Sequence, residues 1–322
     1  MVAEKFIRIA KGLIKAVIPD KHKLVPTGGT NDSRYCYSTW LRHLVLLHEH
    51  KKEIPLTIAE LGPGDSLGTG VAALLCGCEK YIALDIFSYA NPADNLKIFD
   101  ELVIMFNNRS AIPAADEYSQ LKPHLDNYEF PSHILTEAVL TRSMSPEKLA
   151  AIRKEIATPS MSDHFIKYIV PWKPADISNE SIDFLFSQSV LQYMDMDLVY
   201  DTAAKWLRPG GMMAHVVDFS SLGISKLWNG HWAYTATEWK LYSFGKKILL
   251  NRSWIGLHKE YLKKGNFDTL NMVVYKKKDG LQQKRLAKPF RDLPYDDLET
   301  TAAYLLSVKS SLSLKSSLHL KD

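Results

Sequence analysis

Two acidic residues flank a glycine turn in the first third of the chain. Glu60 ends an apolar run at residues 56–61, Gly62 and Gly64 follow it, and Asp85 ends the next apolar run. Glycines supply backbone angles that other residues resist, so a ligand can approach such a turn closely. An acid at the tip of the next strand, roughly 20 residues further on, can hold ribose hydroxyls. The spacing predicts a nucleotide-type ligand site, and a plain turn without a ligand is the alternative.

The glycine spacing separates two cofactor classes. Dinucleotide-binding proteins need a third glycine, and Leu67 stands where it would be. The acid two residues before the first glycine resembles the first motif of the class I S-adenosylmethionine (SAM) methyltransferases. This resemblance implies that Glu60, Gly62 and Gly64 hold the methionine end of SAM and that Asp85 holds its ribose. The chain departs from the family at Ser66, where a third glycine is common.

A second region carries the same resemblance. Residues 182–186 alternate like a central strand, and a helix, the proline-glycine stop signal at residues 208–211 and another strand follow. Ligands of open α/β sheets bind at the carboxyl ends of such strands. We therefore assign Ser187 and Gln188 to cofactor binding. Tyr193 is expected to face the substrate, where many relatives have a Glu-His pair.

The resemblance implies an α/β fold with a seven-stranded, mostly parallel Rossmann-like sheet, helices on both faces and an antiparallel C-terminal hairpin. A helical insertion after strand two, at about residues 87–163, is predicted to cap the substrate mouth; a surface embellishment or an oligomer contact are the alternatives. The methyltransferase domain is expected at residues 51–309, after an N-terminal helical segment at 1–50 and before a flexible tail at 310–322. The predicted elements are helices at 37–50, 94–107, 145–157, 198–207 and 258–264, and strands at 165–170, 182–186, 213–219, 267–275 and 302–308.

Apolar residues recur at helical spacing within residues 1–23, with lysines and arginines between them. A helix packed on the domain is the favoured interpretation, and a helix on a membrane surface is the alternative. In the resembled family a helix just before strand one commonly lies over the cofactor. That makes Tyr35 and Arg42 further candidates for the pocket.

Side chains able to act on an acceptor gather near strands four and five. Methyl transfer from SAM is an in-line displacement that needs alignment, and a hydroxyl acceptor also needs a positioned base. The candidates for catalysis are His231, His215, Asp218 and Tyr193. A strand would direct His215 and Asp218 to opposite faces, because they are three residues apart.

A tryptophan-rich loop follows strand five. Trp228, Asn229 and Trp232 are candidates for substrate binding, because aromatic faces stack on sugars and flat rings. Arg252 is a further candidate, since its planar guanidinium suits bidentate binding of an acidic group; a surface ion pair is the alternative. No recognisable set of metal ligands is found, so no metal is predicted.

Composition limits the alternatives. The chain has 322 residues, of which 46% are hydrophobic and 24% charged, and its net charge is +4, which gives no support for a nucleic-acid partner. Cys36, Cys76 and Cys78 cannot form a disulfide framework and fit a reducing, cytoplasmic compartment. No apolar run reaches the roughly 18 residues that a membrane span needs.

The sequence therefore predicts a SAM-dependent methyltransferase that methylates a hydroxyl on a saccharide or related small molecule. Residues 208–267 resemble most closely a bacterial branch of uncharacterised class I enzymes associated with surface-polysaccharide biosynthesis. An NAD(P)-dependent oxidoreductase and a non-enzymatic SAM-binding scaffold are the alternatives. Base methylation is disfavoured, because Ser187 and its neighbours stand where an Asp/Asn-Pro-Pro-Tyr signature would be. The helical insertion offers a surface for a homodimer.

Overall fold

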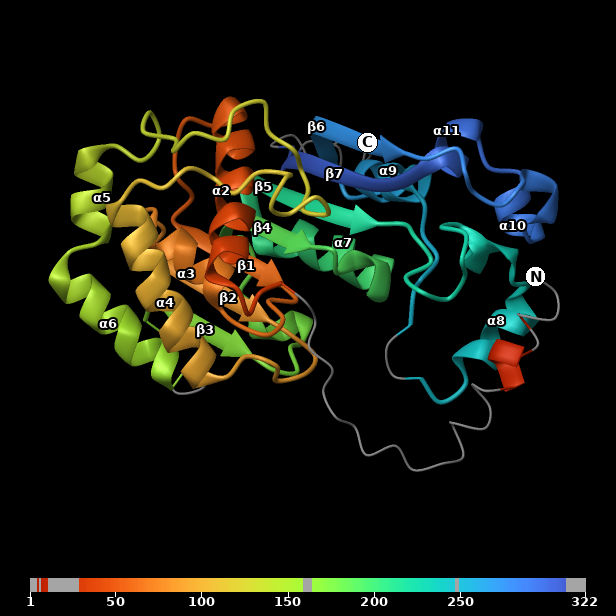
Figure 1. Cartoon of the computed structure of the whole chain (residues 1–322), viewed down its shortest axis with the longest axis horizontal. Coiled ribbons are helices and arrows are strands. Elements are labelled where there is room, and N and C mark those ends of the chain that lie inside the picture. Colours follow the sequence, from red (N-terminus) through yellow and green to blue (C-terminus); the bar gives the residue numbers. More distant parts are fainter. Residues whose placement is uncertain (1–4, 6, 11–28, 159–163, 247–248, 311–322) are drawn as a thin grey trace, which may run out of the picture.

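The computed structural model describes residues 5, 7–10, 29–158, 164–246 and 249–310. One seven-stranded sheet runs through the molecule in the order β3-β2-β1-β4-β5-β7-β6 (Figure 1). Strands β1 to β5 are parallel, and β7 lies antiparallel between β5 and β6. The predicted fold class is confirmed. The strands are β1 (Thr57–Leu61), β2 (Lys80–Leu84), β3 (Ile166–Ile169), β4 (Ile182–Gln188), β5 (Leu207–Asp218), β6 (Phe267–Lys276) and β7 (Thr300–Lys309).

Successive residues of a strand point to opposite faces of the sheet, so apolar side chains lie on both faces, and helices cover both. Ile58 and Phe184 point into one core, with α2, α3, α4 and α6, whereas Ala59 and Leu185 point into the other, with α7 and α9. The helices are α2 (Ser33–His50), α3 (Gly68–Leu75), α4 (Pro92–Asn107), α5 (Glu137–Ser143), α6 (Pro146–Ala157), α7 (Met196–Trp206), α8 (Ala236–Ser243), α9 (Ile255–Lys264), α10 (Lys288–Arg291) and α11 (Tyr295–Glu299).

Helix α2 begins at Ser33, four residues before the start that the sequence predicts. Asp32 accounts for the difference, since its side chain accepts a hydrogen bond from the backbone N of Arg34 and so caps the helix. Trp40 and Leu44 of α2 are fully buried in the core that α3 shares. α2 is therefore part of the domain core, although the sequence grouped it with an N-terminal segment.

The insertion after β2 contains α4, α5 and α6, which lie on the α3 side of the sheet (Figure 1). Between α4 and α5, residues 108–136 form no regular helix or strand. This irregular segment reaches the far edge of the sheet, where the backbone N of His124 donates to the hydroxyl of Tyr275 on β6 at 3.0 Å. The insertion thus supplies a helical layer and a segment that crosses the sheet.

Two predicted boundaries near the C-terminal half differ from the structure. β5 starts at Leu207 instead of 213, because the proline-glycine segment is a bulge within the strand, with φ of +73° at Gly210. β6 and β7 pair as the predicted antiparallel hairpin does, but residues 277–299, with α10 and α11, connect them instead of a tight turn.

The described part of the N-terminal segment packs against the α8 side of the molecule. Lys5 forms an ion pair with Glu238 at 2.7 Å, and Ile9 is buried with Ile224, Tyr234 and Leu250. The rest of the predicted helix at residues 1–23 and the tail after Ser310 lie outside the described residues. Among the helices that are described, none is long and apolar enough to cross a membrane.

Candidate active site

The glycine turn after β1 has the strained backbone that its sequence predicts. Gly62 and Gly64 have φ of +69° and +77°, in the left-handed region that favours glycine. A Cβ on Gly62 would lie 2.7 Å from the side chain of Val190, which follows β4. The turn therefore packs directly on the end of β4, and neither its angles nor its packing tolerate a side chain.

Asp85 lies at the tip of β2, beside this turn. Its Oδ1 accepts hydrogen bonds from the backbone N of Ile86 at 2.7 Å and of Phe87 at 3.3 Å. Burial raises the pKa of Asp85, and hydrogen bonds from the backbone N–H groups of Phe87, Ile86 and Gly64 oppose that rise. The predicted ribose-binding residue and the glycine turn are thus brought together.

Glu60 is buried beneath the turn and is bonded to another side chain. The hydroxyl of Tyr81 donates to its Oε2 at 2.5 Å, and only 2% of Glu60 is exposed. Burial raises the pKa of Glu60 to about 8, against the opposing effect of the Tyr81 hydrogen bond. At neutral pH its carboxyl therefore favours the protonated form.

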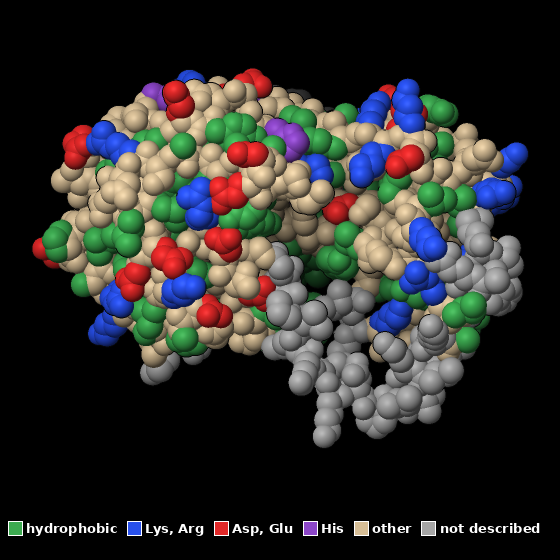
Figure 2. Space-filling model, in the orientation of Figure 1, with side chains coloured by type: hydrophobic (Ala, Val, Ile, Leu, Met, Phe, Trp, Pro, Cys, Tyr) green, Lys and Arg blue, Asp and Glu red, His purple; other side chains and the backbone are tan. Residues whose placement is uncertain are grey.

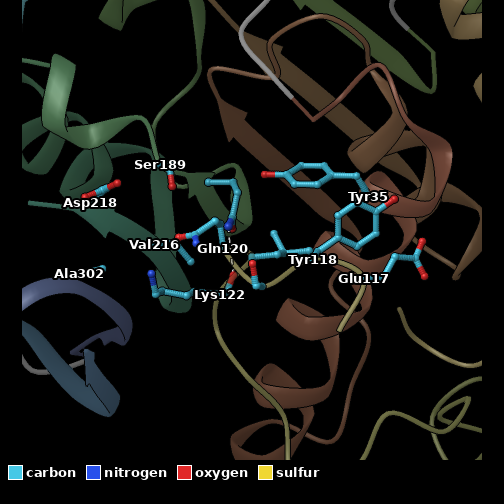
Figure 3. Close-up of a pocket in the computed structure, with 12 residues that line it drawn as sticks. Tyr35, Glu117, Tyr118, Gln120, Lys122, Ser189, Val216, Asp218 and Ala302 are labelled. Carbon is cyan, nitrogen blue, oxygen red and sulfur yellow. Dashed lines mark hydrogen bonds between the residues drawn. The ribbon is translucent and has the colours of Figure 1, made fainter. Parts of the chain in front are cut away.

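A cavity of about 420 Å³ lies at the carboxyl ends of β4 and β5. Figure 3 shows Tyr35 and Tyr118 at one end of it and Asp218 and Lys122 at the other. The predicted residues Gln188, Asp218 and Tyr35 line this cavity. Its remaining lining residues are Glu117, Ser119, Gln120, Leu121, Ser189, Val216 and Ala302.

The irregular segment of the insertion forms one wall of the cavity, at residues 117–122. Arg42, which is fully buried, holds this wall in place. It donates to the carbonyl oxygens of Leu121, Pro123 and Pro113 at 2.9, 2.8 and 2.8 Å. Arg42 therefore does not face the cavity, as a pocket residue would; it fixes the segment that does.

The two residues assigned to cofactor binding at the end of β4 have different surroundings. Gln188 lines the cavity and donates to the carbonyl oxygen of Lys122 at 3.0 Å. Ser187 is fully buried, and its hydroxyl lies 2.9 Å from Nδ1 of His215. Burial, reinforced by the charges of His258 and His43, lowers the pKa of His215 to about 3. His215 is a neutral core histidine and lines neither the cavity nor the crevice.

Asp218 ends β5 and is shared by the cavity and a narrow crevice beside it. Its Oδ1 accepts a hydrogen bond from the backbone N of Ser220 at 2.7 Å. Burial raises the pKa of Tyr193, and the nearby charge of Asp218 raises it further. As predicted, Asp218 and His215 face opposite sides of the sheet.

His231 and Arg252 line the crevice together with Asp218. The crevice has no space for a water molecule, and His231 is 1% exposed. Burial and the charge of Arg252 lower the pKa of His231 to about 3, which makes it a weak base. The guanidinium of Arg252 lies 4.6 Å from the ring centre of Trp239 and 4.9 Å from that of Phe290.

The tryptophan-rich loop predicted to bind substrate is packed into a separate cluster. Trp232 is fully buried and stacks on Phe290 at 5.5 Å, and Trp228 contacts the edge of Trp232. The side chain of Asn229 donates to the carbonyl oxygen of Leu281 and accepts from its backbone N, at 3.2 and 2.6 Å. These three side chains stabilise a loop and do not line the cavity, so the prediction of substrate contact is corrected.

Sequence reasoning named three of the twelve lining residues and missed the rest, of which Tyr118, Gln120, Lys122 and Ser189 bring polar side chains. Of these four, the first three belong to an irregular segment without periodicity or a motif. Ser189 was signalled by its position just after β4, where ligands of α/β sheets bind. Within the described ranges, no group of three or more His, Cys, Asp or Glu side chains could hold a metal ion.

No protein-family model matches the chain. No curated protein is similar to it in sequence. Solved structures with a similar arrangement include a SAM-dependent methyltransferase from Mesorhizobium loti, at 13% identity and a TM-score of 0.39, covering 83% of this chain and 97% of that one. A SAM-dependent methyltransferase from Methanosarcina mazei is similar at 11% identity and a TM-score of 0.42, covering 82% and 97%.

A third similar structure is the geranyl diphosphate C-methyltransferase of Streptomyces coelicolor with Mg²⁺, geranyl diphosphate and S-adenosylhomocysteine. It shares 9% identity at a TM-score of 0.42, and the alignment covers 92% of this chain and 87% of that one. At these identities and TM-scores the likenesses say nothing about substrate or mechanism. Function is therefore inferred from the strand order and the geometry of the site.

Proposed function

We propose that the chain is a SAM-dependent methyltransferase that methylates a hydroxyl on a saccharide or a related small molecule. One observation carries the proposal: the glycine turn and the cavity meet at two adjacent residues. Val190 packs on Gly62, while Ser189 lines the cavity. A ligand held by the turn and by Asp85 would therefore have its reactive end beside a second, separate pocket.

The residues around the turn fit SAM. Gly62 and Gly64 hold the backbone at positive φ, and Asp85 places a buried carboxyl group beside them, which would bind two ribose hydroxyls. Tyr35 is close enough to Glu60 for the charge of Glu60 to act on the pKa of Tyr35, which burial above all raises to about 12. Tyr35 would then lie between the cofactor and the acceptor cavity, which it lines.

Bound SAM would supply a methyl group that is already activated for displacement. The chain's own part is to align the acceptor and to receive its proton. Asp218 is the best-placed base, because it lies at the cavity, at the end of β5, with one oxygen fixed by Ser220. Tyr193 is assigned to orienting the acceptor near Asp218.

Four further assignments belong to the same proposal. Residues 117–122 act as the cap that the sequence predicts for the insertion. Arg252 would bind an acidic group if the crevice, which as it stands has no space for a water molecule, opened. Cys36, Cys76 and Cys78 are buried free thiols, in keeping with a cytoplasmic enzyme. A role in surface-polysaccharide biosynthesis rests on the sequence resemblance alone.

The test is calorimetric titration of the protein with S-adenosylhomocysteine, on wild type, Asp85→Ala and the control Asp201→Ala, an exposed acid on α7. We expect micromolar binding, weakened tenfold or more by Asp85→Ala (about 1.4 kcal/mol) and unchanged by the control. Wild-type protein that binds no S-adenosylhomocysteine would overturn the proposal. NAD would then be titrated, to test the oxidoreductase alternative.

A further inference from the structure

Lys122 brings a cationic side chain to the wall of the cavity without a matched anion. Its ammonium lies 4.8 Å from the ring centre of Tyr275. Among the described residues no carboxylate lies within ion-pair distance of it. Asp218, at the same end of the cavity, attracts it without pairing with it. A half-buried ammonium without a counter-ion is unfavourable, unless a ligand completes its surroundings.

The backbone around Lys122 is fixed on three sides. Arg42 donates from one nitrogen to the carbonyl oxygens of Leu121 and Pro123, which flank Lys122. Gln188 donates to the carbonyl oxygen of Lys122 itself. A lysine on a free loop would turn its charge to solvent, but here the three bonds set the direction in which the side chain leaves the wall. Because the backbone is already fixed, it loses no further freedom on binding, which favours affinity.

Charges of both signs act on Lys122. Burial and the neighbouring charge of Lys277 both lower the pKa of Lys122, while Asp218 raises it. Figure 2 shows the molecule hollowed near its centre, with basic side chains gathered over the half that carries β6, β7 and α10. Acidic side chains are more frequent over the half that carries α3 to α6 (Figure 2). An anionic molecule would thus be attracted to the Lys122 end of the cavity.

From this placement we infer that the acceptor carries an oxyanion, a phosphate or a carboxylate, and that Lys122 binds it. The inference rests on the proposed function and adds a substrate class to it. Asp218, on the same end of the cavity, stays available for the acceptor hydroxyl, because Lys122 takes the acid group. A sugar phosphate and a uronic acid both combine these two features.

The experiment uses inorganic phosphate and acetate as probes, titrated into full-length protein saturated with S-adenosylhomocysteine. Wild type, Lys122→Met, Lys122→Arg, Arg252→Gln and the control Lys278→Met, an exposed lysine beyond the cavity, are compared. We expect at least one probe to bind wild type, with a tenfold or greater loss in Lys122→Met. Lys122→Arg should keep most of the affinity, and Lys278→Met all of it. The probe that binds more tightly tells phosphate from carboxylate.

Three results would overturn the inference. The inference fails if neither anion binds, or if Lys122→Met binds the anions as wild type does. It also fails if the loss of affinity appears only in Arg252→Gln, because that result would place the acid group at the crevice. Saturation with S-adenosylhomocysteine is measured first on every variant. If that step fails in wild type, the proposed function fails; if it succeeds and the anions do not bind, only the inference about Lys122 fails.

Discussion

Nε2 of Gln188, at the end of β4, donates a hydrogen bond to the carbonyl oxygen of Lys122 at 3.0 Å. This bond joins the sheet to the insertion across 66 residues of sequence. It connects the carboxyl end of β4, where ligands of such sheets bind, with the cavity wall at residues 117–122, which no sequence motif predicts. The sheet and the insertion therefore build the acceptor site jointly.

Gly62→Ala should lower the free energy of unfolding by about 1–3 kcal/mol and weaken S-adenosylhomocysteine binding, because a Cβ there meets Val190 at positive φ. Gly210→Ala is a matched control, with φ of +73° and nothing within 4 Å of its Cβ. Urea unfolding of both variants separates the steric effect of Val190 from the effect of positive φ, which the two variants share. Equal losses in the two variants would show that contact with Val190 is unimportant.

Arg42→Lys should lower the free energy of unfolding by about 2–4 kcal/mol, since a lysine cannot reach three carbonyl oxygens and leaves them buried. Amide hydrogen exchange in residues 113–123 should become faster, while exchange in α3 changes less. The exposed ion pair of Arg153 with Asp100 provides the control: Arg153→Lys should lower stability by less than about 1 kcal/mol. Unchanged exchange in the segment would contradict the role given to Arg42.

Glu60 should make the protein less stable as pH rises. Its folded-state pKa of about 8 lies above the ordinary value of 4.5, so its contribution is complete below pH 4.5 and is lost as pH rises through 8. Each pKa unit corresponds to about 1.4 kcal/mol, so the total is several kcal/mol. Urea unfolding between pH 5 and 9 measures it, and Glu60→Gln should flatten the profile. A Gln variant with the wild-type slope would assign that slope to other groups.

Asp218→Asn should lower turnover about 100-fold or more, and His231→Gln less than tenfold, because Asp218 lies at the cavity and His231 is a buried, weakly basic group. Release of S-adenosylhomocysteine over a panel of sugar phosphates and uronic acids measures turnover. Both variants should bind S-adenosylhomocysteine as wild type does. A larger loss of turnover in His231→Gln would identify His231, a catalytic candidate from the sequence, as the base.

Asn229→Ala should lower the free energy of unfolding by about 1–3 kcal/mol without changing S-adenosylhomocysteine binding, because both of its hydrogen bonds go to the backbone of Leu281. Asn127→Ala on the exposed irregular segment is the control for stability. If Asn229→Ala instead left stability intact and reduced turnover, the substrate role first given to this loop would be correct.

The sheet could be predicted because its strands carry local signals. The glycine turn, the acids at strand ends and the proline-glycine segment each act within a few residues of their own position. The cavity wall could not be predicted, because the segment that carries Lys122 is held at the site by hydrogen bonds from Arg42, some 80 residues earlier in the chain. The tryptophan-rich loop misled for the same reason, since Asn229 is satisfied by Leu281, 52 residues later.

Strand β7 lies between β5 and β6, although it is the last strand of the described residues. During synthesis, β5 and β6 therefore wait with unpaired edges until residues 300–309 have left the ribosome. Pairing over so long a sequence separation is slow, and open strand edges favour aggregation in the interval. Nascent chains of this protein should consequently depend on chaperones until late in translation, and a stop codon before residue 300 should give an insoluble product.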